Sequence, residues 1–181
     1  MTIPLWAVAV VSLTIVAGGT NTAPDSGRAA PKAKGVLTDS AGKEVGTIEA
    51  ETANDGLRII VKVHDVPGGE FGIHVHAGDG CGSGDGGEAF AAAGPHFDPL
   101  NRGIHAGLNG PGHAGDLGNI SVTADGKGKL DVVSKDLTIE PGKMDILGKP
   151  IVLHAHSDNL TDKPENGGSD GRLACGVLGS T

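Results

Sequence analysis

Two histidines, one residue apart, end a β-like run in the stretch GIHVHAGDGC, residues 72–81. Successive side chains of a strand point to opposite faces, so His74 and His76 share one face while Val75 packs on the other. Two imidazoles on one face at a strand end form half of a transition-metal site. A pair of solvent-facing polar residues would give the same pattern, so further ligands must decide between the two interpretations.

Imidazoles recur along the rest of the chain. Seven of the eight histidines lie in predicted loops or at predicted strand ends: His74, His76, His96, His105, His113, His154 and His156. Asp116 follows His113 by three residues in HAGD. This number of imidazoles exceeds what core packing requires, and imidazole with one carboxylate suits zinc or copper better than magnesium or calcium. The eighth histidine, His64, is predicted to be a surface residue.

Short strands separated by turns must position these residues. Patterns typical of strands occur at 35–39, 44–52, 57–63, 70–76, 119–124, 129–133, 151–156 and 172–178. Asn54-Asp55-Gly56 and Asp125-Gly126 are typical hairpin turns. Two long segments, 77–117 and 157–170, lack a strand pattern, and loops of this length are usually functional. The sequence therefore predicts an all-β fold, an eight-stranded antiparallel Greek-key barrel or sandwich with two long functional loops.

The N-terminal residues have a different composition. The run from Ile3 to Ala17 is apolar and uncharged, but shorter than the roughly 20 residues of a membrane span. We therefore expect a signal peptide over 1–19, with a retained membrane anchor as the alternative because no Lys or Arg precedes the run. A flexible linker is expected over 20–34 and one domain over 35–181. Such a chain would be exported: periplasmic, secreted or associated with the cell envelope, without stable membrane association after cleavage.

Charge and cysteine content narrow the classes of partner. The formal net charge of −8 and the lack of a basic stripe exclude nucleic acid as a partner. A small anionic substrate stays compatible with this charge, because the local field in a cleft matters more than the total. Cys81 and Cys175 both lie in the exported part, where a disulfide is the default and thiolate ligation of a soft metal is the alternative. The sequence leaves monomer and homodimer open.

Five motifs occur in one order: GIHVH, AGPHFDP, HAGDLGN, VLHAHSDNL and GRLACGV. In these motifs and their order the sequence resembles the copper/zinc superoxide dismutases, over roughly residues 35–179. The cysteine five residues after the second histidine of HVH is similar to the bacterial branch of that family. The fold that the resemblance implies agrees with the one predicted from the strand pattern.

The resemblance implies a site for two metals, copper and zinc. The implied copper ligands are all imidazoles: His74, His76, His96 and His154. The implied zinc ligands are His96, His105, His113 and Asp116, with His96 bridging the two metals through its two ring nitrogens. His156 shares a strand face with His154, but the family motif uses only the first of the two, so we expect His156 to bind no metal.

Further roles follow from the resemblance. It implies a Cys81–Cys175 disulfide, a carboxylate at Asp158 between the two metal sites, and a guanidinium at Arg172 beside the open copper position. The implied reaction converts two superoxide anions and two protons into dioxygen and hydrogen peroxide by redox cycling of copper, with a structural zinc. Arg172 would orient the anion and His96 would supply a proton.

Two rival functions remain open at this level. A copper- and zinc-binding module without turnover could share the fold, but such a module need not keep Arg172. A copper-only dismutase would lack zinc ligands, whereas His105, His113 and Asp116 are all present.

Overall fold

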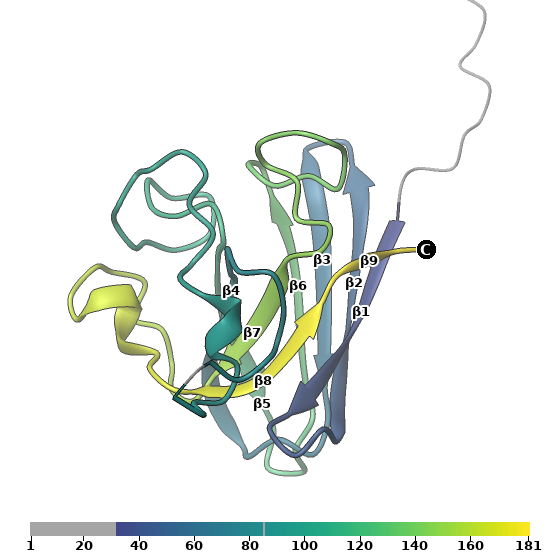
Figure 1. The fold of residues 1–181 in the computed structure, drawn as a ribbon, viewed down its shortest axis with the longest axis vertical. Coiled ribbons are helices and arrows are strands. Elements are labelled where there is room, and N and C mark those ends of the chain that lie inside the picture. The colour runs from purple at the N-terminus through teal and green to yellow at the C-terminus, as the bar shows by residue number, and fades with distance from the viewer. Residues whose placement is uncertain (1–31, 85) are drawn as a thin grey trace, which may run out of the picture.

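The structure, a computed structural model, describes residues 32–84 and 86–181 and shows an all-β domain (Figure 1). The strands are β1 (Lys32–Asp39), β2 (Glu44–Ala53), β3 (Gly56–Val63), β4 (Gly69–Val75), β5 (Asp116–Val122), β6 (Gly128–Ser134), β7 (Pro150–His154), β8 (Arg172–Val177) and β9 (Gly179–Ser180). Two short 3-10 turns, η1 (Ala91–Ala93) and η2 (Glu165–Gly168), are the helical elements of the described residues.

The strands form one closed antiparallel sheet. Their order is β2-β3-β6-β5-β4-β7-β8-β1-β9, and pairing of β1 with β2 closes the barrel. The neighbours β3–β6, β4–β7 and β8–β1 are not consecutive in sequence, which is the Greek-key wiring that the sequence predicted. Because the sheet is closed, nearly every strand is hydrogen-bonded on both sides, and the barrel rigidly positions the residues at its strand ends.

Local sequence explains the regular part of the barrel. In β3 the side chains of Leu57, Ile59, Val61 and Val63 are buried, and those between them are more exposed, as expected for a strand with one face on the core. Asn54 and Asp55 form the two-residue turn to β3, because Ala53 pairs with Gly56. The buried side chains of all eight long strands form one apolar core inside the barrel.

Most strand boundaries differ from the predicted ones by one to three residues, and three of the differences have a clear structural reason. β1 begins at Lys32, because Lys32 to Lys34 pair with Glu51 to Glu49 of β2 and Lys34 also pairs with Gly179. β5 begins at Asp116, where it pairs with His74 of β4. β7 ends at His154, two residues early, because Ala155 and His156 instead donate backbone N–H groups to Asp170 and Ser169.

Two long segments leave the barrel and lie together beside β4 and β7, as the teal and yellow loops of Figure 1 show. The first runs from the end of β4 to the start of β5 and contains η1; the second runs from β7 to β8 and contains η2. A disulfide joins Cys81 of the first segment to Cys175 of β8, at a sequence separation of 94. Both predicted long loops therefore exist.

The expected signal peptide, and the expected linker up to residue 31, lie outside the described residues. Among residues 32–84 and 86–181, none of the helical turns is long and apolar enough to cross a membrane.

Leu37→Ala tests the barrel core, with Val36→Ala as its neighbour control. Leu37 is fully buried, whereas Val36 on the same strand is 48% exposed. Leu37→Ala should therefore lower the free energy of unfolding by about 2–5 kcal/mol, and Val36→Ala by less than about 1 kcal/mol. Urea denaturation of the metal-free proteins measures both, and equal losses would contradict this account of the core.

Candidate metal centre

Strand ends and loops bring six histidines together at one side of the barrel. His74 lies on β4, His154 ends β7, and His76 follows β4 and forms an isolated bridge with His96. The strands hold these backbone positions through ladder hydrogen bonds. His96, His105 and His113 come instead from the long segment between β4 and β5, which has little regular structure of its own.

Four of these imidazoles form one group, the four-imidazole group: His74, His76, His96 and His154. All four residues are buried, and each offers a ring nitrogen within 4.8 Å of the others. The Nε2 atoms of His76 and His154 lie 3.1 Å apart. No carboxylate belongs to this group.

Three imidazoles converge on one carboxylate oxygen, and we name this set the carboxylate group: His96, His105, His113 and Asp116. The Nδ1 atoms of His96, His105 and His113 lie 2.9, 3.1 and 3.3 Å from Oδ1 of Asp116. His96 therefore belongs to both groups, because its Nδ1 faces Asp116 and its Nε2 lies on the opposite edge of the ring.

His113 is the outermost member of the carboxylate group. The ligand atoms of His74, His96, His105 and Asp116 all lie within 4.8 Å of one another, whereas His113 is not in that set and its side chain is 13% exposed. Two other histidines lie away from both groups. His156 is exposed and follows the end of β7, and His64 is 45% exposed beside Asp65.

Outer hydrogen bonds assign the tautomers of three rings. Nε2 of His74 and Nε2 of His105 each lie 2.8 Å from the carboxylate of Asp158, so both donate outward and turn Nδ1 inward. Nδ1 of His76 lies 2.8 Å from the carbonyl of Gly94, so it donates there and turns Nε2 inward. An inward lone pair held by an outer partner is the usual arrangement of a metal-binding histidine.

The inward atoms fit metal ions. Nδ1 of His74 and Nδ1 of His105 are buried and make no hydrogen bond with any described residue. A buried polar atom without a partner is costly, and a bound cation would remove that cost. Two atoms held by one ion at about 2.0–2.1 Å lie about 3 Å apart, which matches the separations around Asp116 and between His76 and His154. The donor sets also fit, since four nitrogens suit copper and three imidazoles with one carboxylate suit zinc.

Burial keeps the four-imidazole group neutral. Loss of hydration lowers the pKa of His74 to about 4 and that of His76 to about 3. Burial, with the neighbouring imidazoles, lowers the pKa of His154 to about 2. These rings are therefore uncharged at neutral pH, which is the form in which imidazole binds a metal.

The carboxylate group has the opposite balance. Although burial opposes ionisation, the adjoining imidazoles of His105, His113 and His96 hold the pKa of Asp116 far below its usual range. Burial alone would lower the pKa of His105, but the carboxylates of Asp116 and Asp158 raise it to about 9. The two groups thus differ in charge, and only this one contains an anion.

Asp158 links the two groups and is itself held in place. Its Oδ2 accepts from His74 and its Oδ1 from His105. The side chain of Asn119, on β5, donates to the backbone carbonyl of Asp158 and accepts from its backbone N–H, both at 2.7 Å. A Cβ atom on Gly72 would come within 3.2 Å of Cβ of Asp158, and one on Gly167 would collide with its Oδ1, so both glycines make room for it. Asn119 was not among the residues predicted from the sequence, where its only signal is its place in HAGDLGN.

Arg172 stands at the start of β8, beside the four-imidazole group. Its guanidinium donates to the backbone carbonyl of Gly94 at 2.7 Å and to that of Phe90. Phe90 is buried in a small cluster with Cys175, against which Cys81 packs, so the disulfide braces the segment that holds Arg172. These two carbonyls could not be predicted from the sequence, because every residue type carries the same backbone acceptor.

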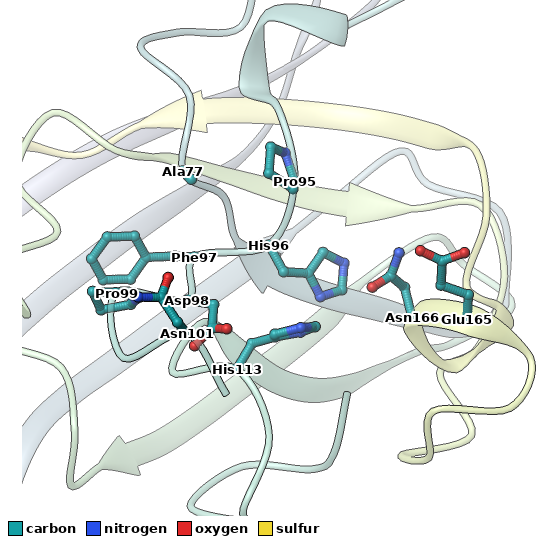
Figure 2. Close-up of a pocket in the computed structure, with 10 residues that line it drawn as sticks. All are labelled: Ala77, Pro95, His96, Phe97, Asp98, Pro99, Asn101, His113, Glu165 and Asn166. Carbon is teal, nitrogen blue, oxygen red and sulfur yellow. The ribbon is translucent and has the colours of Figure 1, made fainter. Parts of the chain in front are cut away.

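Two openings lead from solvent to His96. One is lined by His76, His96, His154 and Arg172; its other charged lining residues are Glu88 and Asp170, so Arg172 is its one cationic side chain among the described residues. The second is shown in Figure 2, where the ring of His96 points toward Asn166 and Glu165, and His113 lies below it. Pro95, His96 and Asn166 line both openings.

Comparisons with known proteins agree with this geometry. The sequence profile of the copper/zinc superoxide dismutases (SODC) matches residues 44–178. The chain is 40% identical over 146 residues to the superoxide dismutase [Cu-Zn] of Brucella abortus, covering 78% of this chain and 83% of the relative.

Solved structures give the same result. The Cu/Zn superoxide dismutase from Brucella abortus superposes with a TM-score of 0.71 and 36% identity, covering 81% of this chain and 98% of that one. A SOD-like protein from Bacillus subtilis superposes with a TM-score of 0.68 and 32% identity, covering 80% of this chain and 96% of that one. By profile, by sequence and by structure, the chain belongs to the copper/zinc superoxide dismutase family.

Proposed function

We propose that this protein is an active superoxide dismutase that converts two superoxide anions and two protons into one dioxygen and one hydrogen peroxide. One superoxide loses an electron in this reaction and the other gains it together with both protons. The observation that carries the proposal is the combination of an all-nitrogen group, an adjoining carboxylate group that shares His96 with it, and a guanidinium at the opening.

The donor sets assign each metal. His74, His76, His96 and His154 would hold copper, and His96, His105, His113 and Asp116 would hold zinc. Copper would supply the one-electron redox couple, and zinc would supply fixed positive charge and order in the loop. The carboxylate of Asp116 favours a dication on its own side, while the neutral side offers nitrogen ligands only.

His96 has a position from which it can hold a proton for the reaction. Its Nδ1 lies on the Asp116 side, while the same ring belongs to the four-imidazole group and lines the opening that contains Arg172. A proton on Nε2 would therefore stand beside the place where an anion is held. Near-complete burial of the ring, whose side chain is 4% exposed, limits exchange of that proton with bulk water.

Arg172 can hold the anion. Backbone carbonyls of Phe90 and Gly94 fix the guanidinium without neutralising it, because neither acceptor carries a formal charge. The opening also contains Glu88 and Asp170, so attraction of an anion there depends on Arg172. A metal-storage module would have no need for this arrangement.

Export is part of the proposal. The disulfide between Cys81 and Cys175 is expected of a protein that matures in an oxidising compartment, and the apolar run near the N-terminus is typical of a signal peptide. We therefore propose a periplasmic, secreted or cell-envelope location. Mass spectrometry of the protein from its native compartment would test this by locating the mature N-terminus.

Metal content and superoxide turnover, measured on one purified sample, test the function. The expected result is one copper and one zinc per chain with rapid turnover that is lost when copper is removed. Full copper occupancy without turnover would favour the metal-binding module, and turnover with copper but no bound zinc would favour a copper-only dismutase.

Arg172→Ala should slow turnover by about 10-fold or more at low ionic strength, because the one cation that the described residues place in the lining is lost while two carboxylates remain. Both metals should stay bound, and added salt should no longer slow the reaction. Stopped-flow rates at several salt concentrations measure this. Arg58→Ala is the control, because it changes the net charge by the same amount. It removes a surface guanidinium of β3 that pairs with Asp131 of β6. An unchanged rate in Arg172→Ala would refute the role of the guanidinium.

Asp158→Asn should weaken zinc binding by about 10–100-fold, because the two imidazoles donate to different oxygens and one of these becomes an NH2 group, which cannot accept. Copper should be less affected, since β4 holds His74 while an irregular segment holds His105. Competition with a chelator gives both affinities. Asp131→Asn serves as control, because this surface carboxylate also accepts hydrogen bonds from two residues, Arg58 and Lys129. Wild-type zinc affinity in Asp158→Asn would show that this carboxylate merely solvates a loop.

Replacing both Cys81 and Cys175 by Ser should lower the free energy of unfolding by about 2–5 kcal/mol, because the crosslink closes 94 residues of chain. Turnover should also fall while both metals remain, because the cluster that braces Phe90 and hence Arg172 is loosened. Denaturation and metal analysis of the variant measure the two effects. Full activity with reduced stability would show that the disulfide does not help to position Arg172.

A further inference from the structure

A second carboxylate of the β7–β8 segment reaches His105. The backbone N–H of His105 donates to Oδ1 of Asp162 at 2.9 Å, while the ring Nε2 donates to Oδ1 of Asp158 at 2.8 Å. Asp158 and Asp162 are four residues apart on the same segment. The β7–β8 segment thus holds His105 at both its backbone and its ring, through two separate hydrogen bonds to two different carboxylates.

The backbone around His105 needs such support. It lies outside every strand, and Gly103, two residues before it, has a positive φ of 64°. Carboxylates accept from three N–H groups in this stretch: Gly103 donates to Asp98, His105 to Asp162 and Ala106 to Asp116. Of these three acceptors, only Asp162 comes from the β7–β8 segment.

Asp162 is itself presented by a local turn. The side chain of Asn159 accepts from the backbone N–H of Thr161 at 2.8 Å and donates to the carbonyl of Lys163 at 3.0 Å. These bonds bracket Asp162 on both sides. The carboxylate is therefore aimed by its own turn and does not depend on the metal groups.

We propose that Asp162 is a positioning residue for zinc, one that fixes the backbone of His105 so that its inward Nδ1 stays directed at the position shared with Asp116. The inference rests on the proposed zinc site and extends it, because it makes zinc retention depend on a contact that touches neither metal nor ligand ring. A charged acceptor on a backbone N–H is a strong hydrogen bond, and its loss leaves a loop ligand free to rotate. Loss of this contact should weaken zinc binding and leave copper binding unchanged.

The decisive measurement is the zinc affinity of the full-length, copper-loaded protein by chelator competition, in wild type, Asp162→Ala and Asp162→Asn. Asp162→Ala should lower zinc affinity by about 10-fold, the lower end of what an outer partner contributes, and should leave copper content unchanged. Asp162→Asn keeps an acceptor oxygen and should restore most of the affinity. Asp145→Ala is the matched control, since its carboxylate also accepts a backbone N–H, that of Leu147, in a segment without proposed ligands.

Hydrogen exchange of the peptide containing His105 supplies a readout that does not depend on activity. The His105 amide should exchange faster in metal-free Asp162→Ala than in metal-free wild type or Asp162→Asn. Wild-type zinc affinity in Asp162→Ala, or equal losses in the Ala and Asn variants, would overturn the proposal.

His105→Ala separates failure of this proposal from failure of the zinc site. If His105→Ala lowers zinc affinity strongly and Asp162→Ala does not, Asp162 has no positioning role and the zinc site stands. If neither variant changes zinc affinity, zinc does not bind at this group, and both the site and the proposal fall.

Discussion

The carboxylate of Asp158 is the contact on which the rest of the centre depends. It receives one N–H from His74, on a strand of the barrel, and one from His105, on a loop. These two bonds decide which nitrogen of each ring faces inward and join the four-imidazole group to the carboxylate group. A buried carboxylate must be compensated, and here two imidazoles and a backbone N–H from Leu160 provide the compensation.

The closed barrel allows such a demanding polar cluster. Strand pairing fixes Asn119 on β5, and its side chain in turn fixes the backbone of Asp158 at both hydrogen-bonding groups. Gly72 and Gly167 have no side chains, which leaves room for the side chain of Asp158. The sheet therefore fixes the side-chain amide of Asn119, this amide fixes Asp158, and the carboxylate of Asp158 fixes the ring of His105, which lies outside every strand. The loops become ordered by contacts with one another and with the sheet.

Membership of the family does not by itself settle activity, because folds host more than one function. The chain superposes on a superoxide dismutase and on a protein described only as SOD-like, with similar TM-scores. Turnover therefore depends on particular residues. His76 and His154 face the opening with neutral nitrogens, and Arg172 stands beside them as its one cation among the described residues. A binding module would need the nitrogens but not the guanidinium.

Local sequence determined the elements and the chemistry of this protein. Alternating apolar residues predicted the strands, turn residues predicted the hairpins, the histidines with Asp116 favoured zinc or copper, and the resemblance of five ordered motifs to the family implied two metals with Asp158 between them. Tertiary structure alone decided how these parts meet. The outward bond of each imidazole, the carbonyls of Phe90 and Gly94 that hold Arg172, and the reach of Asp162 to His105 all join segments distant in sequence. Such contacts depend on the paths of irregular loops, which have no periodic pattern, and on backbone groups, which every residue carries alike.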